Sequence, residues 1–302
     1  MTDFTGHVVA TDRGKVRGSA TQAVVAFRGI PYVASPVDQI RFAVPRKHPG
    51  WTVVREAVDA GPAVPQGPSR LERVMGPRTP DWNEEGSLTL NVWSLRQALE
   101  DEAPRPVLVW FHGGGFTSGS GGWDWYDGAR LAEAGNVVVV TANYRVGPLG
   151  YLYLPQIGAD NLGAQDQAAV LRWVRDNIAS YGGDPRAMTI GGQSAGALSA
   201  LSLALDPTTG GLVRRVLPGA SRRRIPSKPP RPPRNTSACW TSPVPQIPRR
   251  PFSLFPSGGS CPPTASWRLV SRARATRPLR CTRCSAASVY PKPGNRRWRT
   301  GP

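Results

Sequence analysis

The chain has 302 residues and a formal net charge of +18, a length that fits one large domain or two smaller ones. Residues 1–220 contain 20 Lys and Arg and 20 Asp and Glu, so this part is formally neutral. Residues 221–302 contain the other 18 basic residues, no acidic residue, all four cysteines and 16 of the 32 prolines. The high overall charge therefore gives no reason to expect the first part to bind nucleic acid.

The sequence lacks the marks of several protein classes. The N-terminus has no basic patch followed by an apolar core, as a secretory signal would have. No apolar run approaches the roughly 18 residues that a membrane-spanning helix needs. Residues 1–220 contain no cysteine, which excludes disulfides and thiolate metal sites within them. We therefore expect a cytoplasmic protein without membrane contact.

Strand and helix patterns alternate along residues 1–220. Pro106–Phe111 and Asn136–Thr141 are short β-branched runs bounded by Pro and Gly, which predicts strands covered on both faces of a parallel sheet. Ala129–Ala134, between them, is a predicted short helix. Gln165–Ala179 has apolar residues at helical spacing and predicts a longer helix. This order favours a doubly wound α/β architecture.

A glycine-rich segment, His112-Gly113-Gly114-Gly115-Phe116, directly follows the first of these strands. Consecutive glycines let backbone N–H groups converge without side-chain obstruction, as an oxyanion hole requires. A phosphate-binding loop is disfavoured because no Gly-Lys-Ser/Thr follows. Taken alone, the segment could also be an ordinary turn.

The most informative motif is Gly192-Gln193-Ser194-Ala195-Gly196. A predicted strand, Ala187–Ile190, precedes it and a run of small residues typical of a helix follows. Glycines on both sides of Ser194 permit the tight strand-to-helix turn of a nucleophile elbow, which exposes the hydroxyl and points the Ala195 N–H toward a forming oxyanion. A glycine-rich strand–helix junction without catalytic role is the alternative.

These motifs lack their usual partners. In serine hydrolases of the α/β type, an acid and then a histidine follow the nucleophile in the sequence. The only histidines here are His7, His48 and His112, and the last acidic residue is Asp206, at the end of the helix that the elbow opens. His112 could be a replacement base, but its place in the glycine loop favours a structural role. We therefore predict a nucleophile and an oxyanion hole without a triad acid or histidine.

The chain resembles the N-terminal half of the type-B carboxylesterases, the α/β-hydrolase family that includes para-nitrobenzyl esterases and cholinesterases. The resemblance implies an α/β-hydrolase fold, a small carboxylic ester as substrate and no cofactor. It implies that Ser194 is the nucleophile and that the N–H groups of Gly114, Gly115 and Ala195 form the oxyanion hole. Besides the glycine loop and the elbow, the matching stretches are Phe27–Tyr32, Arg41-Phe42, Gly61-Pro62, Pro65-Gln66, Leu90–Trp93, Tyr126–Gly128, Asn143–Gly150, Asn161–Gly163, Asp166-Gln167 and Tyr181–Pro185.

Other positions depart from the family pattern or allow two interpretations. Val64 and Ser87 occupy positions where many relatives have a disulfide, so that bridge is absent here, consistent with a reducing compartment. Gln193 stands where relatives often have glutamate, a change we expect to be tolerated. Trp123, Trp125 and Tyr126 could line a substrate gorge or simply pack together. Cys281 and Cys284 have metal-site spacing but lack a second ligand pair, which argues against zinc.

The last part of the chain, residues 221–302, is a basic, Pro- and Arg-rich stretch that we expect to be disordered. Its composition suggests a frameshifted translation of the second half of an esterase. The hypothesis predicts a truncated, very weakly active enzyme whose elbow strand is an open sheet edge. A non-catalytic binding protein on a hydrolase scaffold, or nucleic-acid binding through the basic stretch, are the alternatives.

Overall fold

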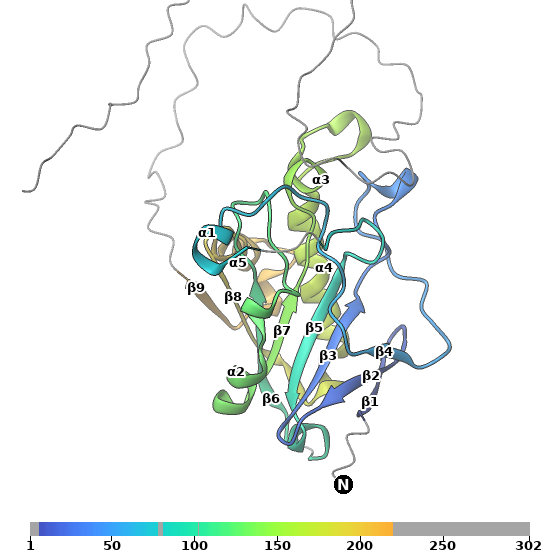
Figure 1. Cartoon of the computed structure of the whole chain (residues 1–302), viewed down its shortest axis with the longest axis vertical. Helices are drawn as coiled ribbons and strands as arrows, with labels where there is room; N and C mark the ends of the chain where they lie inside the picture. Colours follow the sequence, from blue (N-terminus) through green and yellow to red (C-terminus); the bar gives the residue numbers. More distant parts are fainter. Residues whose placement is uncertain (1–5, 78–80, 102, 220–302) are drawn as a thin grey trace, which may run out of the picture. The chain divides into compact units, whose positions relative to one another are not determined.

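The structure of the protein is a computed structural model that describes residues 6–77, 81–101 and 103–219 (Figure 1). The expected disorder of residues 221–302 and the Cys281/Cys284 pair lie outside the described residues. The described residues form a nine-stranded sheet of order β1-β2-β3-β5-β7-β6-β8-β9, with β4 paired to β2. The strands are β1 Val8–Thr11, β2 Gly14–Ala20, β3 Val24–Pro31, β4 Arg55–Ala57, β5 Thr89–Leu95, β6 Arg105–Phe111, β7 Val138–Ala142, β8 Gly183–Gln193 and β9 Arg215–Gly219. The α-helices are α1 Glu72–Met75, α2 Ala129–Gly135, α3 Gly147–Tyr151, α4 Leu162–Asn177 and α5 Ala195–Leu205.

The sheet is mixed rather than wholly parallel. β7, β6, β8 and β9 are parallel neighbours, as the β-branched runs predicted. The neighbouring pairs from β1 to β7 along the sheet are antiparallel. The α/β class is confirmed, and the N-terminal strands add an antiparallel section to the doubly wound core.

Helices cover both faces of the central strands. Val138 and Val140 of β7 belong to the large core cluster that also contains α4 and α5 residues, including Leu171 and Leu203. Val139, between them, packs on the other face in a smaller cluster with α2 residues. Successive side chains of a strand point to opposite faces, so coverage on both sides explains why every residue of β7 is buried and why all except Thr141 are apolar. None of the described helices is long and apolar enough to cross a membrane.

The elbow strand is not an open edge, and this expectation was wrong. β9 pairs in parallel with the outer side of β8, from Thr189↔Arg215 to Gln193↔Gly219. A short 3-10 turn at Gly210–Leu212 follows α5 and returns the chain to the sheet. The strand is only five residues long and mostly exposed, so it has no burial pattern that the sequence could reveal. Within the described part of the chain, β9 is the edge next to the elbow.

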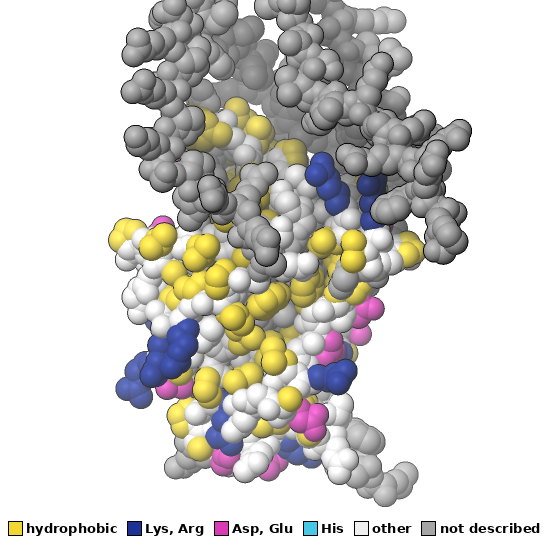
Figure 2. Space-filling view, turned by 90° about the vertical axis from the view of Figure 1, so that its left-hand side faces the viewer, with side chains coloured by type: hydrophobic (Ala, Val, Ile, Leu, Met, Phe, Trp, Pro, Cys, Tyr) yellow, Lys and Arg dark blue, Asp and Glu magenta, His cyan; other side chains and the backbone are white. Residues whose placement is uncertain are grey.

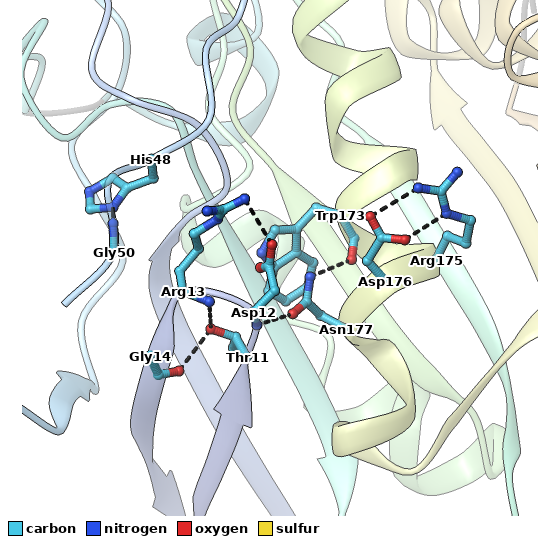
Figure 3. Close-up of polar contacts among 10 residues, drawn as sticks. All are labelled: Thr11, Asp12, Arg13, Gly14, His48, Gly50, Trp173, Arg175, Asp176 and Asn177. Carbon is cyan, nitrogen blue, oxygen red and sulfur yellow. Dashed lines mark hydrogen bonds and ion pairs between the residues drawn. The ribbon is translucent and has the colours of Figure 1, made fainter. Parts of the chain in front are cut away.

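The N-terminal hairpin is anchored to the end of α4 (Figure 3). The Asp12 amide donates to Asn177 Oδ1 at 2.8 Å, and Asn177 Nδ2 donates to the Trp173 carbonyl at 2.9 Å. In the same view, Gly50 N donates to His48 Nδ1 at 3.0 Å. His48 therefore has a local structural contact within its own loop.

A buried ion pair joins the segment after β7 to α4. Arg145 and Asp166 are 1% and 0% exposed, and Arg145 Nη2 lies 2.8 Å from Asp166 Oδ1. Arg145 Nη1 also donates to the carbonyls of Arg41 and Ala43 at 3.0 and 2.8 Å. Burial raises the pKa of the Asp166 carboxyl, while the hydrogen bonds from Arg145 oppose that shift. The pair fixes three distant segments beside the core.

Candidate active site

The glycine loop, His112–Phe116, and the elbow, Gly192–Gly196, both begin where the parallel strands β6 and β8 end, at their C-terminal ends. Phe111, the last residue of β6, is paired with Gly192 near the end of the parallel strand β8. The two segments that follow then touch through their backbones. A Cβ on Gly113 would lie 3.0 Å from the Gln193 carbonyl oxygen, and one on Gly196 would lie 2.7 Å from the His112 carbonyl oxygen. A side chain at position 196 would overlap this backbone, and one at position 113 would fit only if the Gln193 backbone shifted slightly.

Ser194 has the geometry of a nucleophile elbow. Its φ of 53° and ψ of −111° lie outside the regions that ordinary residues prefer, and strain of this kind concentrates at functional sites. The residue is exposed, whereas Ala195 and Gly196 are buried. Its amide donates to the Gly219 carbonyl of β9 at 3.2 Å. The turn thus presents the hydroxyl to solvent, and no described residue forms a hydrogen bond with that hydroxyl.

Three backbone N–H groups of the glycine loop and the elbow have no hydrogen-bond acceptor outside a helix among the described residues. Gly114 and Gly115 have φ values of 125° and 65°, and their N–H groups donate to no described residue. Ala195 is the first residue of α5, where an N–H has no partner inside the helix. Such free amides can stabilise a developing negative charge on oxygen.

Tyr126 connects the glycine loop to the elbow. Its hydroxyl accepts a hydrogen bond from Gly113 N at 3.3 Å and donates one to Gln193 Oε1 at 3.2 Å. The neutral glutamine amide supplies the acceptor that this bridge needs. Trp123 is instead largely buried and contacts the Trp125 ring edge-on at a centroid distance of 5.0 Å. Of the three aromatic residues, Trp123 and Trp125 pack against each other, whereas Tyr126 holds the glycine loop against Gln193.

Two polar side chains, Gln66 and Asn143, bind the backbone of Gly119 and Gly121, just after the glycine loop. The sequence did not predict this role for them. Gln66 Oε1 accepts from Gly119 N at 2.5 Å, and Gln66 Nε2 donates to the Gly119 carbonyl at 2.9 Å. Asn143 Oδ1 accepts from Gly121 N at 2.8 Å, and its Nδ2 donates to the carbonyl of Ser87 at 2.9 Å. These bonds join segments 22 to 56 residues apart, so no local pattern could have identified them.

His112 lies in the interior rather than at the serine hydroxyl. Its ring stacks on Tyr144 at a centroid distance of 4.2 Å, and Nδ1 lies 2.8 Å from the Gly113 carbonyl oxygen, within hydrogen-bonding distance. Its Nε2 has no hydrogen-bond partner among the described residues. Burial lowers its pKa to about 4. His112 is therefore neutral at pH 7 and packed in the core.

Asp206 is far from the elbow. It follows the last residue of α5, whose 11 residues span about 16 Å. The exposed carboxylate accepts from the Thr208 amide and hydroxyl, both at 2.7 Å, and these bonds lower its pKa. Asp206 caps the end of α5 and orients no histidine. His7 lies against Glu100, with 3.5 Å between Nε2 and Oε1.

We compared the sequence with models of known protein families. The model of the carboxylesterase family matches residues 5–225. The chain belongs to the carboxylesterase family. The carboxylesterase resemblance inferred from the motifs is confirmed.

Individual carboxylesterases give the same result. The para-nitrobenzyl esterase of Bacillus subtilis (strain 168) is 41% identical over 224 residues, which are 72% of this chain and 45% of that protein. Acetylcholinesterase of Gallus gallus is 41% identical over 225 residues, 69% of this chain and 29% of that protein. A solved thermophilic para-nitrobenzyl esterase superposes with a TM-score of 0.67 at 41% identity, over 73% of this chain and 46% of that structure. The chain thus has the α/β-hydrolase fold and spans less than half the length of these relatives.

Proposed function

We propose that this carboxylesterase-family chain acts on small carboxylic esters through Ser194. The hydroxyl attacks the ester carbonyl, and the oxyanion forms against the N–H groups of Gly114, Gly115 and Ala195. The carbonyl reforms as the alcohol leaves, which gives an acyl-enzyme that water then cleaves. The strained, exposed backbone of Ser194 beside free amides is the observation that supports this proposal.

The missing element is a proton acceptor. All three histidines precede the serine in the sequence, and His112 is neutral, buried and stacked on Tyr144. Loss of a triad member lowers the rate by about 10⁴–10⁶-fold. We therefore propose that this chain alone turns over esters at least about 10⁴-fold more slowly than an intact relative.

Acylation of the chain tests the assignment of Ser194. The full chain is incubated with p-nitrophenyl acetate, digested, and its peptides are analysed by mass spectrometry. Acetyl groups should accumulate slowly at Ser194, because deacylation also lacks a base, and Ser194→Ala should remove that adduct. The variant Ser202→Ala changes an exposed serine of α5 and should leave labelling unchanged. Equal acetylation of Ser194 and Ser202 would contradict the assignment.

We also propose that the protein is cytoplasmic. We propose as well that residues 221–302 are translated from a shifted reading frame. Their composition, 18 basic and no acidic residues, supports this idea. The coding DNA tests it: another reading frame beyond codon 217 should encode an acid and a histidine in hydrolase context. If neither frame does, a non-catalytic scaffold or a nucleic-acid-binding protein becomes the better explanation. Steeply salt-dependent DNA binding that disappears when residues 221–302 are deleted would support the second.

A further inference from the structure

His112 holds the carbonyl group of the peptide that joins Gly113 to Gly114. Its Nδ1 lies 2.8 Å from the Gly113 carbonyl oxygen. A carbonyl oxygen only accepts hydrogen bonds, so the proton of the neutral ring lies on Nδ1 and Nε2 carries a lone pair. Among the described residues, no other group donates a hydrogen bond to this carbonyl. The side chain of His112 therefore fixes the carbonyl side of this peptide group.

The position of this carbonyl determines where the Gly114 N–H points. In a planar trans peptide, the C=O of one residue and the N–H of the next point in opposite directions. With the Gly113 carbonyl held against the ring of His112, the Gly114 N–H points away from that ring. His112 and Gly113 are buried, whereas Gly114 is partly exposed. The N–H thus points away from the ring and remains available to a ligand.

Glycine on both sides makes this peptide plane easy to reverse. Gly113 and Gly114 have no Cβ, and Gly114 has a φ of 125°, a conformation that glycine adopts at little steric cost. Rotation of the plane would turn the N–H toward the ring and the carbonyl oxygen toward the site. A carbonyl oxygen there would repel a developing oxyanion. The hydrogen bond from His112 opposes this rotation.

The hydrogen bond lies in a closed part of the fold. The His112 ring is 1% exposed and stacks on Tyr144, whose hydroxyl donates to the His112 carbonyl at 2.9 Å. A Cβ on Gly119 would overlap both Nδ1 of His112 and the Gly113 carbonyl oxygen. The Gln66 amide holds the backbone of Gly119 in this place. Burial strengthens a hydrogen bond of this kind because water does not compete for it.

The surface of the molecule agrees with this burial. Figure 2 views the molecule from the side of β9, and it shows hydrophobic side chains across the middle of that face. No described histidine side chain is visible there. The ring of His112 therefore acts from inside the fold, behind the glycine loop.

The next peptide of the loop is held in a different way. The Gly114 carbonyl accepts from the amides of Thr117 and Ser118 at 3.1 and 3.3 Å. These two backbone donors orient the peptide that carries the Gly115 N–H, so this second donor does not depend on one side chain. The peptide between Gly113 and Gly114 has no such backbone donor among the described residues. It depends on His112.

We propose that His112 is a positioning residue of the oxyanion hole, whose Nδ1–H fixes the peptide that presents the Gly114 N–H to the ester oxygen. This inference rests on the proposed function, because it assigns a role in the acylation of Ser194. It gives His112 no part in proton transfer. Any side chain that places an N–H where Nδ1 lies can replace the imidazole. Asparagine has such an N–H and phenylalanine does not.

Imidazole NMR tests the hydrogen bond without a measurement of activity. Long-range ¹H–¹⁵N spectra of the full chain at pH 7 distinguish the two neutral tautomers of a histidine ring, and the spectrum of His112→Asn assigns the signals. We expect the proton of His112 on Nδ1 and none on Nε2. A proton on Nε2 would overturn the proposal, because Nδ1 would then have no hydrogen to donate to the Gly113 carbonyl.

Acylation kinetics test the positioning role. Acetylation of Ser194 by p-nitrophenyl acetate is followed by mass spectrometry of the full chain over a range of ester concentrations. His112→Phe keeps a ring for the stack on Tyr144 but loses the donor. Its maximal acylation rate constant should fall about 10²–10³-fold, the effect of one lost oxyanion-hole donor, with the half-saturating ester concentration unchanged. His112→Asn should retain most of the rate, and the control His48→Phe, which lies in another loop, should retain all of it.

The outcomes separate this inference from the proposed function. Equal losses of rate in His112→Phe and His112→Asn would overturn the positioning role, and so would a full rate in His112→Phe. If near-UV circular dichroism shows that His112→Phe does not fold, the tautomer in the unmodified chain decides the inference. Absence of acetylation at Ser194 in the unmodified chain would overturn the proposed function, and the tautomer would still show whether His112 holds the Gly113 carbonyl.

Discussion

Phe111 and Gly192 lie opposite each other in the register of the parallel strands β6 and β8. Because both strands run in the same direction, the glycine loop after Phe111 and the elbow after Gly192 leave the sheet together. The two segments, which carry the proposed oxyanion donors and the proposed nucleophile Ser194, are about 80 residues apart in the sequence, yet their backbones are in contact. Parallel α/β sheets commonly place their sites at this edge.

The close contact of loop and elbow makes Gly196 intolerant of a side chain. In Gly196→Ala, the new Cβ would overlap the Phe111 carbonyl oxygen, and we expect a loss of about 1–3 kcal/mol in the free energy of unfolding. Gly211→Ala is the control, since nothing lies within 4 Å of its added Cβ. Urea unfolding of both variants measures the difference. Similar midpoints for the two would show that the backbones are not in contact.

The strain at Ser194 predicts a stabilising substitution. Glycine adopts a φ of 53° without steric cost, so Ser194→Gly should stabilise the fold by about 1 kcal/mol, after subtraction of the greater chain entropy of glycine. Ser202→Gly, in the regular part of α5, should destabilise it by a few tenths of a kcal/mol, roughly. Thermal unfolding reports both signs. Destabilisation by Ser194→Gly would refute the strained conformation.

His112 should make the fold sensitive to mild acid. Its pKa is about 4 in the folded state and 6.5 ordinarily, so the unfolded chain takes up a proton first as the pH falls. Its contribution to stability is therefore complete above pH 6.5 and decreases toward pH 4, by about 3 kcal/mol in all. Urea unfolding at pH 7 and pH 5 measures this loss, which should be smaller in His112→Asn. Imidazole NMR signals of a protonated His112 at pH 5 in the folded protein would contradict it.

The Arg145–Asp166 pair should be costly to break. Asp166→Asn leaves the buried guanidinium without its counter-ion, and we expect a loss of about 3–5 kcal/mol. Asp176→Asn breaks a pair with Arg175 in which both side chains are nearly half exposed, a change of less than about 1 kcal/mol. Denaturant unfolding compares the two. A small effect of Asp166→Asn would mean that the buried pair does not hold its three segments together.

Local sequence patterns predicted the parts of the site that depend on neighbours in the chain. The run Pro106–Phe111 lies within β6, and the predicted helix Gln165–Ala179 overlaps α4. The elbow and the glycine loop could be identified from sequence because their backbone conformations and close contacts require glycine at fixed positions. The family resemblance, also visible from these motifs, is confirmed.

Contacts between distant segments were not predictable in this way. The Tyr126 bridge depends on a hydroxyl reaching two segments that the fold brings together. The side-chain amides of Gln66 and Asn143 accept hydrogen bonds from Gly119 and Gly121, which are far from them in the sequence. β9 lacks periodicity because it lies at an edge, and its pairing with β8 follows from the return turn after α5. These features arise from tertiary structure rather than from local pattern.

The most direct test of the account is the rate of p-nitrophenyl acetate hydrolysis by the full chain and by Ser194→Ala, beside the Bacillus subtilis para-nitrobenzyl esterase. We predict turnover at least about 10⁴-fold below that esterase, because His7, His48 and His112 all contact residues other than Ser194. Turnover comparable to the esterase, abolished by Ser194→Ala, would contradict it.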